Sequence, residues 1–147
     1  MQLTRAADYA VRVMIHLAGL PAGARSSRTE LANAASCPEQ FLSKVLQNLT
    51  RAGLVMSHRG NTGGFELPGQ RRNASVLDVI EAVEGPIHLN ICLAQDDACE
   101  RQSWCPAHQV WANAQKAMTD VLRNTSIAEL AGKMPPAVPW TVVPRWN

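Results

Sequence analysis

The chain has 147 residues, of which 46% are hydrophobic and 18% are charged, so it can bury the core of one compact domain, with or without an extended arm, but not of two large domains. No apolar run approaches the ~20 residues of a membrane-spanning helix, and Arg5 and Asp8 stand where a signal peptide would need an apolar core. We therefore expect a cytoplasmic protein that has no membrane partner.

The formal net charge of +2 hides an uneven distribution along the chain. Residues 1–72 hold nine Lys/Arg against four Asp/Glu, a net charge of +5, whereas residues 73–147 hold five against eight, a net charge of −3. An anionic partner is attracted to a surface that carries excess positive charge. We therefore expect such a partner to bind the N-terminal half.

Helical periodicity dominates the first 53 residues. Residues 5–20 predict a helix with one apolar side, formed by Ala7, Ala10, Val11, Met14, Ile15 and Ala18. The capping-box pair Ser27 and Glu30 predicts the start of a second, short helix. A third is predicted to begin at Pro38 and to stop at Gly53, with a core side formed by Leu42, Val45, Leu46 and Leu49. Two short helices joined by a brief turn make a helix-turn-helix.

A glycine-rich hairpin is predicted to follow these helices. Residues 54–56 and 65–67 are short β-prone runs, and the segment between them is polar and rich in glycine. A hairpin directly after a helix-turn-helix is the wing of a winged helix. We therefore expect a mainly α fold with a small β-hairpin wing.

Three more helices are expected in the C-terminal half. Ser75 and Asp78 open one over residues 76–84, Pro106 opens a long one, and Ser126 precedes a short last one. The long helix has an apolar side formed by Val110, Trp111, Ala114, Ala117, Met118, Val121 and Leu122. This side is longer than a small core needs, so we expect it to pack against a second copy of the chain, although packing against the first helix would give the same pattern.

These elements divide the chain into three parts. Residues 1–72 are expected to form the winged helix-turn-helix domain, and residues 73–131 a cysteine-containing loop with the dimerisation helix. Residues 132–147, which hold several prolines with Trp140 and Trp146, are expected to form an extended tail.

The third helix has the composition of a DNA recognition helix. With its apolar side turned inward, its outward side chains are Gln40, Ser43, Lys44, Gln47 and Arg51, which can contact phosphates or base edges. Glu39 is the acidic exception, and it can accept a hydrogen bond from a cytosine amino group or stabilise the helix N-terminus.

Three further residues are candidates for DNA contact. Arg28 is a candidate phosphate clamp, Arg59 at the wing tip can enter a minor groove, and His58 is a candidate wing contact. A solvated helix face is the alternative for each single residue, and winged helices also serve protein contacts. The combination of helix-turn-helix, wing and basic charge favours double-stranded DNA.

Soft metal ligands are concentrated in residues 92–108, as Cys92-x6-Cys99-x5-Cys105-x2-His108. On a helix, Cys92 and Cys99 would lie roughly 10 Å apart along the axis, too far for one small metal site. The three thiols can therefore converge only if residues 92–105 form a loop, in which Asp96 and Asp97 would be solvated. In a reducing compartment such cysteines indicate metal ligands or redox sensors before they indicate disulfides.

The end of this loop is well placed to hold an anionic ligand. Cys105 precedes Pro106 and so occupies the N-cap of the long helix, and His108 falls in its first turn. Three thiolates with one further ligand can hold a zinc ion or an iron-sulfur cluster, and free surface thiols are the third reading. Cys37 stands apart and is expected to be a buried small residue or a helix-cap position.

Four motifs match a known family. They are Leu3-Thr4-x4-Tyr9-Ala10, the helix and strand Phe41-Leu42-Ser43-Lys44-Val45-Leu46-x2-Leu49-x3-Gly53-Leu54-Val55, the wing Arg59-Gly60-x2-Gly63-Gly64-Phe65, and the three-cysteine loop. In this combination, residues 1–131 resemble the bacterial regulator family that contains IscR and NsrR. The resemblance implies a homodimeric winged-helix transcription factor with an iron-sulfur cluster in each subunit, whose ligands are Cys92, Cys99 and Cys105.

The resemblance leaves the fourth ligand open. His108 matches the ligand of the branch with a 2Fe-2S cluster, and Asp8, acting from the partner subunit, matches the ligand of the nitric-oxide-sensing branch with a 4Fe-4S cluster. The first cysteine gap is one residue longer than the family's usual five. We favour Asp8 and 4Fe-4S, because an aspartate at this position is distinctive whereas His108 can simply cap its helix.

The functional hypothesis is a transcriptional regulator, and specifically a repressor, whose operator affinity is controlled by a cluster that senses nitric oxide, redox state or iron-sulfur status. One alternative is a zinc-stabilised DNA-binding protein without a sensing role. The other is an iron-sulfur redox enzyme, but the chain carries no nucleotide-binding fingerprint, so we expect no enzymatic activity.

Overall fold

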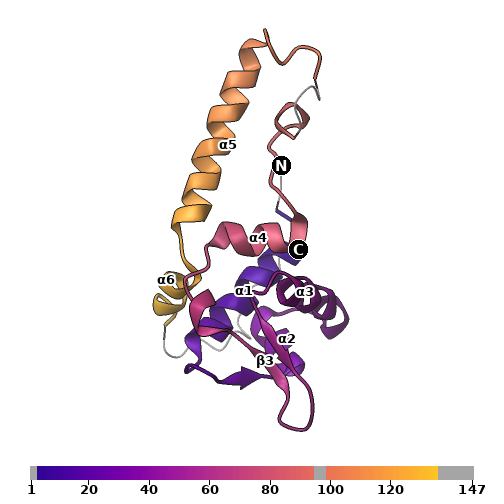
Figure 1. Cartoon of the computed structure of the whole chain (residues 1–147), viewed down its shortest axis with the longest axis vertical. Coiled ribbons are helices and arrows are strands. Elements are labelled where there is room, and N and C mark those ends of the chain that lie inside the picture. The colour runs from indigo at the N-terminus through magenta and orange to yellow at the C-terminus, as the bar shows by residue number, and fades with distance from the viewer. Residues whose placement is uncertain (1–2, 95–98, 136–147) are drawn as a thin grey trace.

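The computed structural model describes residues 3–94 and 99–135. They form a compact body from which a long helical arm projects (Figure 1). The body contains α1 (Arg5–Gly19), β1 (Arg25–Ser26), α2 (Arg28–Ala35), α3 (Glu39–Arg51), β2 (Met56–His58), β3 (Gly64–Glu66), the 3-10 turn η1 (Gly69–Arg71), α4 (Val76–Glu84) and α6 (Ile127–Gly132). The arm contains the 3-10 turn η2 (Ile91–Leu93) and α5 (Pro106–Asn124).

Helix α1 lies at the centre of the body, where it contacts α2, α3, α4 and α6. Its buried side is formed by Ala7, Ala10, Val13, Met14, Leu17 and Ala18. Val11 and Ile15 of the predicted apolar side are partly buried and pack against the core, whereas Val13 and Leu17, which were not predicted, are buried. A central helix is covered from more than one direction, so one stripe of apolar residues does not define its buried face.

The helix-turn-helix forms as predicted. Ser27 Oγ accepts a hydrogen bond from the Glu30 amide, and the Glu30 carboxylate accepts one from the Ser27 amide at 2.7 Å. Ser36 closes α2 in the left-handed region, with φ 52°. Helix α3 begins at Glu39 and not at Pro38, because Pro38 has an extended ψ of 134°.

The wing belongs to a three-stranded antiparallel sheet with the order β1-β3-β2. The strands lie one to two residues from their predicted positions, because Leu54 and Val55 are buried, at 4% and 1% exposure, and enter the core before the hairpin starts. Strand β1 was not predicted, since two residues carry no periodicity. A Cβ at Gly63 would lie 2.5 Å from the His58 carbonyl oxygen, so the loop between β2 and β3 requires glycine there.

The start of α4 is tied to the start of α6. Ser75 caps α4 with a capping box to Asp78, as predicted, and Ser75 also pairs with Ser126 in an isolated β-bridge. Ile127, the first residue of α6, is fully buried in the core. The chain therefore leaves the body at the C-terminal end of α4, runs out along the arm and returns beside the N-terminal end of the same helix.

The arm consists of α5 and the segment that climbs beside it (Figure 1). The Leu89 amide donates to Gln115 Oε1 at 2.8 Å and joins the two. Helix α5 packs against α4 and η2, and Met118 and Leu122 are the predicted apolar residues that lie partly buried against the core. The other predicted apolar residues of α5 are exposed: Val110, Trp111, Ala114, Ala117 and Val121.

The fold is mainly α with a small antiparallel sheet, as predicted from the sequence. Within residues 3–94 and 99–135, no helix has the length and apolarity needed to span a membrane. Asp96 and Asp97 of the cysteine loop, and residues 136–147 of the expected tail with Trp140 and Trp146, lie outside the described residues.

Candidate DNA-binding groove and cysteine loop

A groove of about 870 Å³ lies between the start of α2, the outer side of α3 and the wing. Its lining residues are Arg28, Gln40, Ser43, Lys44, Leu46, Gln47, Thr50, Arg51, Ser57, Arg59 and Phe65. The DNA-contact candidates from the sequence are among them, with the exceptions of His58 and Glu39. The lining includes four cations and no acid, which suits a polyanion.

The groove exists because α3 is sharply two-sided. Leu42, Val45, Leu46 and Leu49 are buried on the inner side. Gln40, Lys44, Gln47 and Arg51 are exposed on the outer side. A helix whose buried side is complete presents its remaining side chains as one continuous face, which is what a major groove admits.

Arg28 reaches from α2 across to α3. Its Nη1 donates to Ser43 Oγ at 3.3 Å, and its Nε lies 3.9 Å from Glu39 Oε2. Ser43 Oγ in turn donates to the Glu39 carbonyl oxygen at 3.1 Å. These contacts hold Arg28 beside the N-terminal end of α3.

His58 ends β2, where it pairs with Gly64 beside the wing loop, and it does not line the groove. Its Nε2 is 2.9 Å from Glu66 Oε2, at an angle outside hydrogen-bond geometry. Arg25 Nε lies 3.6 Å from the same oxygen, and Arg25 Nη1 donates to the Thr62 carbonyl at 3.1 Å. The sequence analysis did not single out Arg25 or Glu66, because their pairing depends on a strand that carries no sequence signal.

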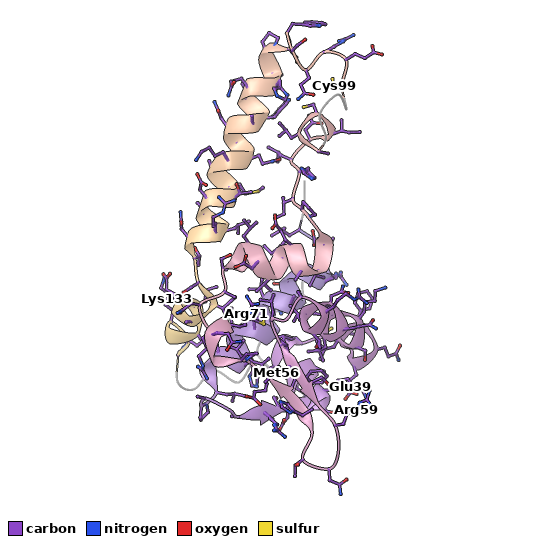
Figure 2. The ribbon with its side chains drawn as sticks, viewed as in Figure 1. Glu39, Met56, Arg59, Arg71, Cys99 and Lys133 are labelled. Atoms are coloured by element: carbon purple, nitrogen blue, oxygen red, sulfur yellow. The ribbon has the colours of Figure 1, made fainter. Side chains whose placement is uncertain are left out.

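The cysteines other than Cys37 lie along the outer part of the arm. Cys92 is buried within η2, whereas Cys99 and Cys105 are half-buried. Cys105 is the N-cap of α5, as predicted, and its amide donates to the Arg101 carbonyl at 2.8 Å. Figure 2 shows Cys99 at the tip of the arm, at the opposite end of the molecule from Glu39 and Arg59.

His108 shows an unsatisfied nitrogen next to these cysteines. Its amide donates to the Cys105 carbonyl at 3.1 Å, so its ring lies in the first turn of α5. Its Nδ1 is buried and has no hydrogen-bond partner within the described chain, and Gln102 Oε1 shares that state. A buried polar atom without a partner lowers stability, and a metal ion bound to His108 Nδ1 would remove that cost.

The structure does not gather the predicted ligands in one place. Across residues 3–94 and 99–135, no three His, Cys, Asp or Glu side chains lie close enough together to hold one metal ion. Asp8 lies on the exposed side of α1, where Arg12 donates to both carboxylate oxygens at 2.7 and 3.3 Å. Helix α1, which carries Asp8, belongs to the body, whereas Cys99 lies at the tip of the arm of the same chain (Figures 1 and 2).

Cys37 is a buried residue of the core, as expected. It is 7% exposed and its Sγ lies 3.4 Å from the Pro38 carbonyl oxygen. Burial raises the pKa of the Cys37 thiol. This cysteine therefore belongs to the core of the body and is separate from the three on the arm.

Comparison with known proteins places the chain among bacterial regulators. Residues 3–133 match the Rrf2 family, which is described as an iron-dependent transcriptional regulator. A Mycobacterium tuberculosis relative, described as a candidate HTH-type transcriptional regulator, is 34% identical over 132 residues, which are 90% of this chain and 82% of the relative.

Solved structures show the same fold. The global cysteine regulator CymR of B. subtilis superimposes with a TM-score of 0.74 at 27% identity, over 92% of this chain and 99% of that one. IscR of T. potens superimposes with a TM-score of 0.71 at 23% identity, over 93% and 94%. Family and relatives are transcriptional regulators and not enzymes. The resemblance drawn from the sequence motifs is thus confirmed, and the chain belongs to the Rrf2 family of transcriptional regulators.

Proposed function

We propose that this protein is a homodimeric regulator whose affinity for operator DNA is controlled by an iron-sulfur cluster held by Cys92, Cys99 and Cys105. The observation that carries the proposal is the pairing of Cys105, at the N-cap of α5, with the buried and unpartnered Nδ1 of His108 one turn later. The helix N-terminus favours an anionic ligand at that position. The unpartnered nitrogen can bind a metal ion or, when it carries the proton, donate a hydrogen bond to a thiolate or sulfide beside it.

The donor set fits such a cofactor. Thiolates are the common ligands of iron-sulfur clusters, with one position open to a non-cysteine ligand, and that position falls to Asp8 of the partner subunit or to His108. A bound cluster supplies a centre that oxidants and nitric oxide attack, which frees its protein ligands. Three thiolates and an imidazole also suit zinc, so a zinc-stabilised regulator is the alternative.

Dimerisation is supported by the outer side of α5. Val110, Trp111 and Val121 are 58%, 40% and 66% exposed, and together with Ala114 and Ala117 they form an apolar stripe on a helix about 28 Å long. Exposed apolar surface of this kind marks interaction sites. Pairing of two copies along α5 would bury it and would carry the cysteine loop of one chain toward the other.

A route from the loop to the groove exists within the body. The loop leaves the C-terminal end of α4, where the Glu84 carboxylate accepts a hydrogen bond from the Thr4 amide at 2.9 Å. Thr4 is the N-cap of α1, and α1 contacts α3. A change at the tip can thus reach the recognition helix, and switching requires that cluster-bound and cluster-free forms differ by about 1–3 kcal/mol in DNA-binding free energy.

The test is anaerobic purification with measurement of visible absorption, iron and acid-labile sulfide. We expect a coloured protein with both elements, and loss of colour with altered operator affinity in Cys92→Ser, Cys99→Ser and Cys105→Ser. The matched control is Cys37→Ser, which should keep the colour because Cys37 is a core residue away from the arm. Zinc without sulfide would favour the alternative, and unchanged colour and affinity in all three arm variants would refute the proposal.

A further inference from the structure

A guanidinium and a carboxylate lie next to each other where α3 begins. Arg28 and Glu39 are 3.9 Å apart, between Nε and Oε2, and their side chains are 56% and 47% exposed. Ser43 contacts both residues, because its hydroxyl accepts from Arg28 Nη1 and donates to the Glu39 carbonyl. The result is a surface at the start of α3 on which guanidinium donors and carboxylate acceptors lie side by side, with Arg28 and Ser43 lining the groove and Glu39 next to them.

The major-groove edge of one base pair has the matching pattern. Guanine presents two acceptors, N7 and O6, and its paired cytosine presents the N4 amino donor directly beside them. An arginine pairs with the two guanine acceptors, and a glutamate accepts from the cytosine amino group. A·T pairs present a different order, and they lack the two adjacent acceptors that a guanidinium needs.

We propose that Arg28 and Glu39 together read a single G·C base pair in the operator, with Arg28 on guanine, Glu39 on cytosine and Ser43 positioning Arg28. This inference rests on the proposed DNA-binding function and adds to it the base pair that is read. Arg28 comes from α2, so the reading surface extends beyond the recognition helix itself.

The competing role for Arg28 is a phosphate clamp, and its surroundings argue against it. A carboxylate beside a guanidinium lowers its attraction for phosphate and is repelled by the DNA backbone. Lys44, Arg51 and Arg59 line the groove and are available for phosphates. A carboxylate at the start of α3 favours DNA binding only where it accepts a hydrogen bond from the DNA, such as one from a base amino group.

The experiment is selection of bound duplexes from a library with a randomised core, using the full-length, cofactor-loaded protein. The proteins compared are the wild type, Arg28→Ala and Glu39→Gln. We expect the wild type to enrich a motif with a G·C pair that both variants lose at the same position. The predicted loss of discrimination there is about 5- to 150-fold for each contact, while preferences at the other positions remain.

Two controls separate base reading from other effects. Arg51→Ala, at the far end of α3, should weaken binding to all duplexes alike and flatten its salt dependence, as loss of a phosphate contact does. Replacing the implicated guanine by 7-deazaguanine removes N7 alone, and should weaken binding by the wild type but not by Arg28→Ala. This second control also tests the proposal if a variant fails to fold.

The outcomes are distinct. Loss of preference at two different positions, uniform weakening by Arg28→Ala, or wild-type indifference to 7-deazaguanine would each overturn the G·C reading while leaving DNA binding intact. Failure of the wild type to enrich any motif would instead overturn the proposed function on which the reading depends.

Discussion

At the scale of single residues, Asp8 is the ligand candidate whose surroundings are best defined. Both of its carboxylate oxygens already meet Arg12, and Arg12 also donates to the Ala35 carbonyl at 3.3 Å. The carboxylate is therefore held in one orientation on an exposed helix face. We propose that a carboxylate held in this way can ligate the cluster of the partner subunit.

We predict that Asp8→Ala changes the visible absorption of the anaerobically purified protein, whereas His108→Ala leaves it unchanged. Asp8 would supply the fourth ligand from the partner subunit, and His108 would only line the site. Arg12→Ala is the matched control, because it breaks the same ion pair and keeps the carboxylate. A changed spectrum with His108→Ala alone would transfer the ligand role to the imidazole, and two unchanged spectra would remove both candidates.

His16 should make stability depend on pH. It lies half-buried on α1, where burial lowers the pKa of its imidazole and the charge of Glu30 partly opposes that shift. The unfolded chain then binds the proton more readily than the folded one. The free energy of unfolding is therefore highest, as far as His16 is concerned, above the ordinary histidine pKa of about 6.5, and it declines as the pH falls below that value. We predict that His16→Gln reduces this decline, measured by urea unfolding at neutral and mildly acidic pH. An equal or steeper decline in the variant would contradict the assignment.

The sequence predicted most side chains of the groove but not how they are braced. Gln40, Lys44 and Gln47 follow from the 3.6-residue period once the apolar side of α3 is turned inward. The contact of Glu66 with His58 does not follow, because it joins neighbouring strands whose register depends on tertiary structure. His58 was accordingly expected to face DNA, and the structure places it against Glu66.

At the scale of elements, the helix starts were the most predictable features. Ser27 and Ser75 both cap their helices through the capping boxes that their sequences indicate. Such boxes are local, since side chain and backbone partners lie three residues apart. The strands were displaced and β1 was missed, because two- or three-residue strands are defined by their neighbours and not by their own sequence.

The cap of α4 provides a stability test. Ser75 is buried, its hydroxyl accepts from the Asp78 amide at 3.0 Å, and its amide donates to the Asp78 carboxylate at 2.8 Å. We predict that Ser75→Ala lowers the free energy of unfolding by about 0.5–2 kcal/mol, measured by chemical denaturation. The control Ser57→Ala, on the exposed strand β2, should change it by less than about 0.5 kcal/mol. Equal effects of the two would show that the cap does not matter.

At the scale of the whole molecule, the sequence alone did not show whether the apolar side of the long helix packs against a second copy of the chain or against the first helix. The structure divides that side: Met118 and Leu122 lie against the core, and Val110, Trp111 and Val121 are exposed. Periodicity gives the width of an apolar stripe but not the identity of its partners. The arm itself was predictable, while its division into an inner and an outer face was not.

We predict that Val121→Glu shifts the protein from dimer to monomer in sedimentation experiments and weakens operator binding, because a charge would stand in the proposed interface and two half-sites would no longer be bound together. The matched control is Lys116→Glu, whose exposed side chain lies on the other side of α5, and this variant should remain dimeric. Since Val121 is 66% exposed, neither change should unfold the body. A dimeric Val121→Glu protein would exclude this face as the interface.

The position of the cysteine segment outside the core has an evolutionary consequence. Adding a residue to an exposed connection costs little, since even doubling its length costs only about 0.6 kcal/mol. The gap between Cys92 and Cys99, which is one residue longer than the family resemblance implies, starts in η2 of the arm and ends at its tip. Proteins that share this fold can thus evolve responses to different signals through changes in the arm alone, while the body that is proposed to bind DNA stays the same.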